Sequence, residues 1–122
     1  MFKALFNNNR PTETRTLPRI ENINAAQLND RLKAGEPLLL LDVRSPMEYQ
    51  FDGHIEGSRL LPLQALNGRI NELPKDQTVV CVCRSGNRSQ FAAEQLAMAG
   101  FENVINLRGG IIGWKMSGLP TQ

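Results

Sequence analysis

Four consecutive leucines, Leu38 to Leu41, are the feature that most limits how this chain can fold. Side chains of a strand alternate between its two faces, so a run without polar residues predicts a strand that is buried on both faces. Such strands are typical of parallel sheets in α/β proteins, where helices cover both sides of the sheet. The run therefore predicts a central strand of an α/β fold.

Strands and helices are predicted to alternate along the rest of the chain. Strands are predicted at residues 19–23, 38–41, 59–61, 78–83 and 103–106, and helices at 25–33, 46–51, 64–73, 87–99 and 110–116. Asn24 is expected to cap the first helix, Gly35 to end it and Pro46 to start the second. The alternation predicts a parallel sheet with right-handed crossover connections.

The chain has 122 residues, which is sufficient for one domain with a sheet core covered on two faces. The first 18 residues are rich in asparagine, threonine and arginine and contain Pro11 and Pro18. Segments of this composition bury little apolar surface. We therefore predict a flexible N-terminal extension at residues 1–18 and a folded domain at residues 19–122.

Charge and composition argue against several classes of protein. The formal net charge is only +2 and no basic run accompanies it, which argues against a nucleic-acid partner. No stretch approaches the roughly 20 apolar residues of a membrane helix, and asparagines follow Phe6 where a signal peptide would continue its apolar segment. The cytosol is therefore the predicted location. One histidine and two cysteines, without repeated spacing, predict neither a metal site nor a cofactor.

A cysteine loop follows the fourth predicted strand. Residues 83–89 read Cys-Arg-Ser-Gly-Asn-Arg-Ser, and a predicted helix begins within them. In open α/β sheets, ligands bind beyond the carboxyl ends of the strands. A helix N-terminus adds unpaired N–H groups and partial positive charge, which attract anions. The loop therefore predicts a nucleophilic cysteine held over an anion-binding cradle.

Ionisation of this cysteine requires more than a helix dipole. A free thiol with a pKa of about 8.5 is only a few per cent thiolate at neutral pH. Making it mostly thiolate takes about 2.7 kcal/mol, whereas a dipole typically supplies about 0.3–1 kcal/mol. Inward-pointing N–H groups, with Arg84 and Arg88 nearby, are expected to supply the rest. Gly86 allows a positive-φ turn in this loop, and Ser85 or Asn87 is expected to cap the helix.

The stretch from Cys83 to Ser89 resembles the active-site loop of rhodanese-type sulfurtransferases. Three further segments match that family in the same order: residues 40–49, Leu-Leu-Asp-Val-Arg-Ser-Pro-Met-Glu-Tyr; residues 53–58, Gly-His-Ile-Glu-Gly-Ser; and residues 104–114, which contain Arg-Gly-Gly and Gly-Trp. The resemblance covers roughly residues 19–120. It implies the rhodanese-like fold, a five-stranded, mostly parallel sheet with helices on both faces.

The resemblance also implies a reaction. The Cys83 thiolate would take a sulfane sulfur from a donor such as thiosulfate and hold it as a persulfide, which cyanide, a cellular thiol or a protein acceptor would remove. N–H groups of the loop would stabilise both the thiolate and the persulfide. The substrate-binding residues implied are Arg84, Ser85, Gly86, Asn87, Arg88 and Ser89.

Charged residues around the loop have alternative roles. The guanidinium of Arg84 or Arg88 is expected to bind the sulfonate end of thiosulfate, or else to pair with a surface carboxylate. Asp42 is expected to orient the loop through hydrogen bonds rather than to act as an acid. Arg44 is expected to add positive potential, or to pair with Asp42 or Glu48.

Several conspicuous residues are interpreted as structural. His54 is expected to be a hydrogen-bonded residue rather than a general base. Trp114 is expected to pack the last helix on the sheet. Gly109 and Gly110 are expected to allow a tight turn or a close backbone approach. Cys81 is expected to be a buried strand residue, with the resolution of an oxidised Cys83 as the alternative.

Competing functions stay open from the sequence. Cys83 could be a small buried apolar residue in an ordinary turn, and a sulfur seen sealed in the interior would argue against catalysis. A cysteine phosphatase or arsenate reductase is a rival enzyme. Four residues separate Cys83 from Arg88, one fewer than in the related phosphatases, and Val82 stands where those enzymes usually have histidine. A non-enzymatic persulfide carrier or protein-interaction module is the other alternative.

Overall fold

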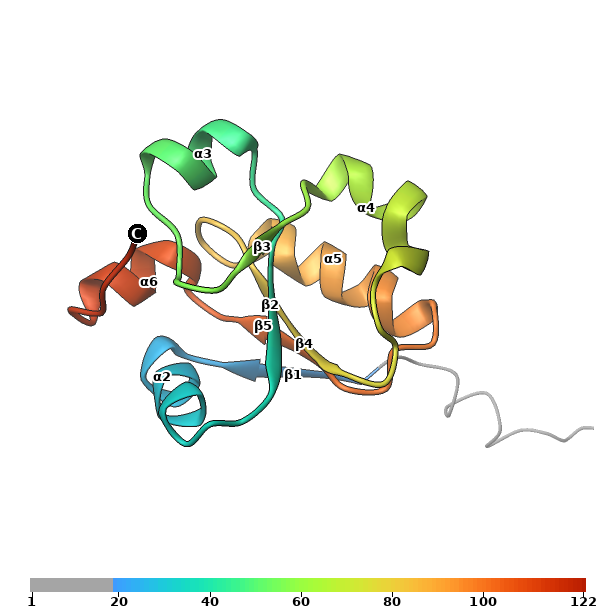
Figure 1. The fold of residues 1–122 in the computed structure, drawn as a ribbon, viewed down its shortest axis with the longest axis horizontal. Helices are drawn as coiled ribbons and strands as arrows, with labels where there is room; N and C mark the ends of the chain where they lie inside the picture. The colour runs from blue at the N-terminus through green and yellow to red at the C-terminus, as the bar shows by residue number, and fades with distance from the viewer. Residues whose placement is uncertain (1–18) are drawn as a thin grey trace, which may run out of the picture.

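The computed structural model describes residues 19–122. Its strands are β1 (Ile20–Ile23), β2 (Leu38–Asp42), β3 (Arg59–Leu60), β4 (Thr78–Val82) and β5 (Val104–Leu107). They form a sheet in the order β1-β5-β4-β2-β3, and every neighbouring pair is parallel (Figure 1). The predicted five-stranded α/β fold is confirmed, and this sheet is parallel throughout.

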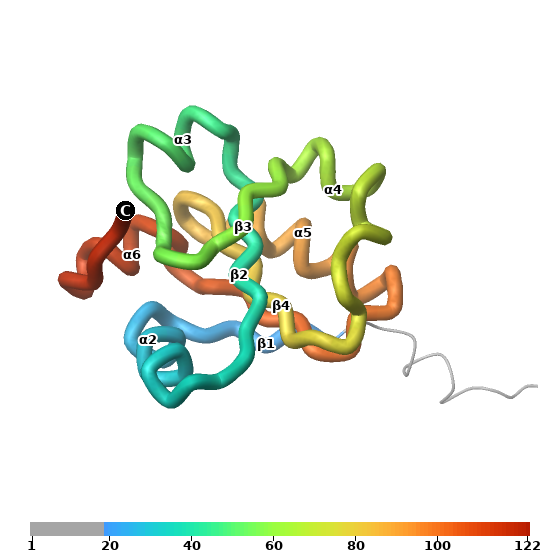
Figure 2. Tube along the Cα trace, viewed as in Figure 1, coloured from blue at the N-terminus to red at the C-terminus, as the bar shows by residue number. Residues whose placement is uncertain are grey.

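Helices cover both faces of the sheet. They are α2 (Ala25–Lys33), α3 (Pro46–Phe51), α4 (Leu63–Arg69), α5 (Asn87–Met98) and α6 (Gly110–Met116), with a short 3₁₀ turn at Ile70–Glu72. α2 and α6 lie on one face, and α4 and α5 lie on the other (Figure 1). The loop between β4 and α5 emerges between α3 and the start of α6 (Figure 2).

Alternate residues of β2 and β4 enter two different cores. Leu41, Val79 and Cys81 belong to the core beneath α4 and α5, whereas Leu40 and Val80 belong to the core beneath α2 and α6. All five side chains are buried. This alternation explains why β2 carries leucine at successive positions, because both of its faces are covered.

Two of the predicted helix starts are confirmed. Asn24 caps α2, and its side chain and that of Gln27 form a reciprocal capping box. Pro46 is the first residue of α3, and Ser45 forms a second capping box with Glu48. This second box follows the Ser-x-x-Glu pattern, which the sequence analysis did not use.

Some predicted boundaries were wrong by a few residues. The helix expected at 64–73 is α4 followed by the 3₁₀ turn, and the third strand ends at Leu60. β5 is shifted one residue toward the C-terminus relative to the prediction. β4 ends at Val82, so Cys83 is the first residue of the following loop. This places the cysteine at the carboxyl edge of the sheet, where α/β proteins bind ligands.

The predicted extension at residues 1–18 lies outside the described residues. Within residues 19–122, no helix is both long enough and apolar enough to cross a membrane. The cytosolic location stays a prediction.

Candidate active site

The loop from Cys83 to Asn87 wraps around the sulfur of Cys83. Gly86 has a φ of +108°, in the left-handed region that its sequence position predicted. The turn brings the backbone N–H of Gly86 to 3.1 Å from the Cys83 Sγ atom. Cys83 is only 1% exposed and packs in the core beneath α4 and α5, which is the burial that was expected to argue against catalysis. Its sulfur differs from an ordinary apolar core atom, because it accepts the hydrogen bond from Gly86.

The predicted side-chain cap of α5 was wrong. Neither Ser85 nor Asn87 caps this helix, because Gly86 occupies the N-cap position and no side chain bonds to the first turn. The physical reason is that backbone N–H groups of this segment point at the cysteine sulfur. Hydrogen bonds from Ser89, Gly86 and Ser85 to Cys83 use groups that a capping side chain would otherwise satisfy.

The two cysteines differ in their tendency to ionise. Burial opposes ionisation of Cys83, whereas hydrogen bonds from the backbone N–H groups of Ser89, Gly86 and Ser85 favour it, and the pKa of Cys83 is lowered. Burial raises the pKa of Cys81 far above its ordinary value, and the neighbouring Cys83 charge raises it further. Cys81 is fully buried in β4, as predicted. Cys83 is therefore the more reactive of the two thiols.

The start of α6 is hydrogen-bonded to the backbone of the cysteine loop. The N–H of Ile111 donates to the Cys83 carbonyl at 2.9 Å, and the N–H of Ile112 donates to the Arg84 carbonyl at 3.1 Å. A Cβ atom added to Gly110 would lie 2.4 Å from the Arg84 carbonyl oxygen. The close backbone approach predicted for this glycine is confirmed.

The two arginines of the loop have different surroundings. Arg88 forms a bidentate ion pair with Glu48 of α3, with nitrogen–oxygen distances of 2.8 and 2.7 Å. Pairing with a surface carboxylate was the predicted alternative to substrate binding for this arginine. Arg84 is exposed and makes no ion pair with any residue from 19 to 122.

The Glu48–Arg88 pair predicts an acid-dependent loss of stability. The hydrogen bond from Arg88 lowers the pKa of Glu48 to about 2, so the pair adds stability above the ordinary pKa of about 4.3. That stability is lost as the pH falls from about 4.3 to about 2. Because Arg88 is 40% exposed, solvent screening reduces the expected loss to about 1 kcal/mol.

Denaturant unfolding across this pH range, on wild type and Glu48→Gln, measures the loss. Glutamine retains the capping box with Ser45, so the variant removes the charge and not the helix cap. The stability of the variant is expected to fall less steeply with acid than that of the wild type. Parallel pH curves for the two proteins would contradict the prediction.

Asp42 and Arg44 form a buried ion pair at the end of β2. Their side chains are 0% and 1% exposed, and Asp42 accepts from the Arg44 Nε atom at 2.9 Å and from a terminal nitrogen at 2.8 Å. The same terminal nitrogen donates to the carbonyl of Gly53 at 2.8 Å. The pairing of Arg44 with Asp42 is one of the predicted alternatives, and it fixes the segment after β2 against the segment before β3. The prediction that Asp42 orients the cysteine loop was wrong, because within residues 19–122 its carboxylate accepts hydrogen bonds from Arg44 and not from the loop.

A cavity of about 220 Å³ lies next to the loop. Its lining consists of Arg44, Asp52, Arg84, Ile111, Ile112 and Lys115. The charge of Arg44 is already paired with Asp42, but Arg84 and Lys115 outnumber the one acidic residue of the lining, Asp52, so the cavity favours an anion. The Nζ atom of Lys115 donates to the backbone carbonyl of Asp52, so two of the lining residues are bonded to each other.

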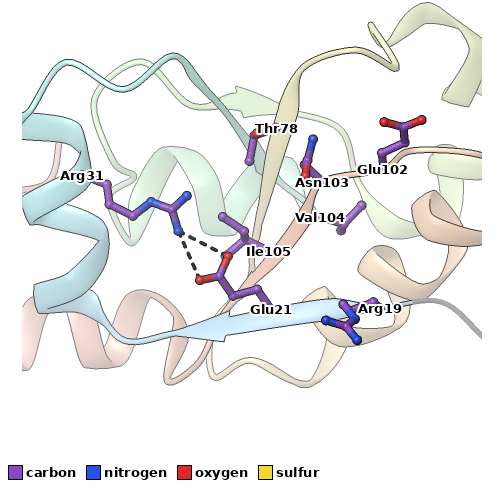
Figure 3. A pocket seen from close by; sticks show the side chains of 8 residues that line it. All are labelled: Arg19, Glu21, Arg31, Thr78, Glu102, Asn103, Val104 and Ile105. Carbon is purple, nitrogen blue, oxygen red and sulfur yellow. Dashed lines mark hydrogen bonds and ion pairs between the residues drawn. The ribbon is translucent and has the colours of Figure 1, made fainter.

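A second cavity lies at the amino end of the sheet, away from the cysteine loop (Figure 3). It has a volume of about 160 Å³ and includes Thr78 at the start of β4 and Asn103 before β5. Arg31 points at Glu21 across this cavity and also binds Glu36. Because these charges neutralise one another, this cavity provides no comparable attraction for an anion.

His54 and Trp114 lie in the structural arrangements that the sequence predicted. The His54 ring stacks on Tyr49 with centroids 3.7 Å apart, and its Nδ1 atom lies 2.9 Å from the Tyr49 carbonyl. Trp114 is 3% exposed and donates to the carbonyl of Pro120. Within residues 19–122, no three His, Cys, Asp or Glu side chains lie close enough together to hold a metal ion.

A buried polar chain lies behind the cysteine, and it was not predicted from the sequence. The hydroxyl of Ser89 lies 3.3 Å from the Cys83 Sγ atom and 2.5 Å from the Oδ1 atom of Asn106 in β5. Ser89 was predicted only as part of the loop, and Asn106 was not considered. An asparagine inside an otherwise apolar strand, Val104 to Leu107, is the signal that could have found it.

Comparisons with known proteins identify relatives of this chain. A model of the rhodanese-like domain family matches residues 24–117. A sulfurtransferase from Allochromatium vinosum is 43% identical over 101 residues, which cover 83% of this chain and 94% of that protein. A thiosulfate sulfurtransferase from Pseudoalteromonas translucida is 36% identical over 95 residues, which cover 78% of this chain and 89% of that protein.

A solved structure has the same fold. The rhodanese-related protein from Thermoplasma volcanium superposes with a TM-score of 0.75 and is 35% identical, covering 84% of this chain and 97% of the other. Some further relatives are longer proteins, of which this chain spans half the length or less.

Proposed function

Since the chain belongs to the rhodanese-like domain family, we propose that it is a sulfurtransferase whose Cys83 carries the transferred sulfur as a persulfide. The observation that carries the proposal is the arrangement of N–H groups around the Cys83 sulfur at the carboxyl edge of the sheet. These groups favour an anionic sulfur at this point, and anionic sulfur is the nucleophile of the reaction.

The first half-reaction transfers a sulfur atom from thiosulfate, the proposed donor. The Cys83 thiolate attacks the outer, sulfane sulfur, and a new S–S bond forms on Cys83. The S–S bond of thiosulfate breaks, and its electron pair leaves with sulfite. The persulfide keeps the negative charge on its outer sulfur, where the loop N–H groups stabilise it.

The second half-reaction returns the enzyme to its starting state. A nucleophilic acceptor, either cyanide or a thiol, attacks the outer sulfur of the persulfide. The S–S bond on Cys83 breaks, and its electron pair returns to the Cys83 sulfur as a thiolate. With cyanide the product is thiocyanate, and with a thiol it is the persulfide of that thiol. Two half-reactions on one residue give ping-pong kinetics.

Positive charge beside the loop supports binding of an anionic donor. Arg84 and Lys115 line the cavity next to the loop, and Arg84 directly follows the nucleophile. Arg84 is the proposed binding group for the sulfonate end of the donor, because Arg88 already binds Glu48. Cys83 is 1% exposed, so the proposal requires the loop to open far enough to admit one sulfur atom.

The proposal is tested by the intact mass of the protein after treatment with thiosulfate. Wild type is expected to gain the mass of one sulfur atom and to lose it again when cyanide is added. Cys83→Ser is expected to show no gain. Cys81→Ala is the matched control, and it is expected to gain sulfur as the wild type does, because Cys81 is fully buried and its pKa is raised. No gain in the wild type, or a gain that survives Cys83→Ser, would refute the proposal.

A further inference from the structure

Two buried polar side chains, Ser89 and Asn106, form a hydrogen-bonded line behind the sulfur of Cys83. The Ser89 hydroxyl lies between the Cys83 Sγ atom and the Asn106 Oδ1 atom, at 3.3 and 2.5 Å. Ser89 is 0% exposed and Asn106 is 4% exposed. The Nδ2 atom of Asn106 donates to the Gly86 carbonyl at 3.3 Å and to the side-chain oxygen of Asn22 at 3.0 Å. Asn22 faces Asn106 in the register of β1 and β5.

The Gly86 carbonyl fixes the direction of every hydrogen in this line. A carbonyl oxygen only accepts hydrogen bonds, so the amide nitrogen of Asn106 has to face Gly86. The amide oxygen of Asn106 therefore faces Ser89. An amide oxygen also only accepts, so the single hydrogen of the Ser89 hydroxyl points at Asn106. The side of the Ser89 oxygen that faces Cys83 then carries a lone pair.

With its hydrogen directed at Asn106, the Ser89 hydroxyl can accept a hydrogen bond from a Cys83 thiol but cannot donate one to a Cys83 thiolate. A neutral Cys83 has an S–H group that donates to Ser89, and Ser89 in turn donates to Asn106. A thiolate has no hydrogen and needs the hydrogen of Ser89. If that hydrogen turns to the sulfur, two accepting oxygens are left 2.5 Å apart. Such a pair is unfavourable in a buried site, where neither oxygen can bind water instead.

We propose that Asn106 is a positioning residue that holds the Ser89 hydrogen away from Cys83 and so limits how readily the cysteine ionises. The Ser89 hydroxyl promotes ionisation only when its hydrogen reaches the sulfur, and Asn106 competes for that hydrogen. The inference rests on the proposed function in giving Cys83 the nucleophilic role. An attacking thiolate loses intrinsic nucleophilicity as its pKa falls, and the best attacking thiol has a pKa near the ambient pH. Asn106 therefore prevents the loop amides from making the sulfur a weak nucleophile.

Other groups that act on the Cys83 charge stay constant when Asn106 is changed. Arg88 of α5 attracts the charge, and Cys81 of β4 is the neighbouring titratable group. Arg88 in turn forms a hydrogen-bonded ion pair with Glu48 of α3 and interacts electrostatically with Asp42 of β2. A change in the acidity of Cys83 on substitution of Asn106 therefore reports on the hydrogen-bonded line.

The test is a pH titration of the thiolate by its ultraviolet absorbance, with the titration of Cys83→Ser subtracted. Asn106→Ala frees the Ser89 hydrogen, and we expect the ratio of thiolate to thiol at a given pH to rise about tenfold, which lowers the pKa of Cys83. Asn22→Ala is the matched control, because it removes a partner of Asn106 without touching Ser89, and its titration is expected to match the wild type. An unchanged or raised pKa in Asn106→Ala would overturn the proposal.

The double variant Ser89→Ala, Asn106→Ala shows whether the effect passes through Ser89. The effect of Asn106→Ala is expected to disappear once Ser89 is alanine, and an effect that persists in full would overturn the proposal. If Asn106→Ala does not fold, the single variant Ser89→Ala shows whether the Ser89 hydroxyl raises or lowers the pKa of Cys83. Loss of a hydroxyl that faces the sulfur with a lone pair is expected to lower the pKa of Cys83, whereas a raised pKa would mean that Ser89 donates to the thiolate.

The titration uses no sulfur donor, so its outcome is separate from that of the mass experiment. A wild type that gains no sulfur refutes the proposed function even if Asn106→Ala shifts the titration. A normal gain of sulfur with no shift refutes only the role of Asn106.

Discussion

Gly110→Ala is expected to destabilise the protein by more than about 3 kcal/mol and to abolish sulfur loading. The added methyl group would lie 2.4 Å from the Arg84 carbonyl oxygen and 2.5 Å from the Cys83 carbonyl oxygen. Both are backbone atoms, so no side chain can move aside to relieve the clash. Gly110 also has a φ of +58°, a left-handed conformation that costs an alanine about 1–2 kcal/mol.

The clash separates α6 from the loop. The hydrogen bonds of Ile111 and Ile112 to the Cys83 and Arg84 carbonyls would lengthen or break, which adds to the cost of overpacking. Cys83 carries the reactive sulfur and Arg84 is the proposed donor-binding group. Displacing their backbone is therefore expected to destroy the geometry of the site. Denaturant unfolding measures the stability, and the mass after thiosulfate measures the loading.

Gly118→Ala is the matched control for Gly110→Ala. Gly118 also has a left-handed φ, +76°, but a Cβ atom there would meet no heavy atom within 4 Å. This variant is expected to show only the conformational cost of about 1–2 kcal/mol and normal sulfur loading. Equal losses of stability in the two variants would show that the contact with the loop contributes little.

Asp42→Asn is expected to cost about 3–5 kcal/mol of stability, because it leaves the Arg44 guanidinium buried without a counter-charge. The Arg44 side chain is 1% exposed, and two of its guanidinium nitrogens bond to Asp42. Asparagine has the shape of aspartate, so the loss would reflect charge and hydrogen bonding rather than packing. Denaturant unfolding is expected to show a lower midpoint with an unchanged slope.

An exposed ion pair provides the comparison for this effect. Glu72 and Arg69 pair at 2.9 Å with both side chains nearly half exposed, and Glu72→Gln is expected to cost less than about 1 kcal/mol. Replacing Asp42 and Arg44 together by leucine and methionine is expected to recover part of the stability lost in Asp42→Asn. A small loss in Asp42→Asn would mean that water reaches the guanidinium.

The fold could be predicted from the sequence because its signals are local. The apolar runs that form β2 and β4, the capping Asn24 and the proline at the start of α3 each act within a few residues of chain. The predicted boundaries failed where two solutions are nearly equal in energy, as at Ile70, where α4 tightens into a 3₁₀ turn.

The candidate site could be predicted only in part. The position of Cys83 and the turn at Gly86 follow from a strand that leads into a helix through a glycine-containing loop. The contacts of Glu48 with Arg88 and of Ser89 with Asn106 span 40 and 17 residues of sequence. Such contacts depend on how α3 and β5 pack against the loop, and no local pattern encodes that packing.

The hydrogen bonds between α6 and the loop determine which part of the loop can move away from the sulfur. The carbonyls of Cys83 and Arg84 accept hydrogen bonds from consecutive N–H groups of a helix that is itself packed on the sheet, so backbone hydrogen bonds fix this part of the loop to the core. Under the proposed function, an incoming sulfur atom would therefore be admitted by the outer rim, Ser85 to Asn87, where the Gly86 N–H bonds to the Cys83 sulfur at 3.1 Å and the Gly86 carbonyl accepts from Asn106 at 3.3 Å. The rate of amide hydrogen exchange at Gly86, relative to Ile111, would report how often this rim lifts.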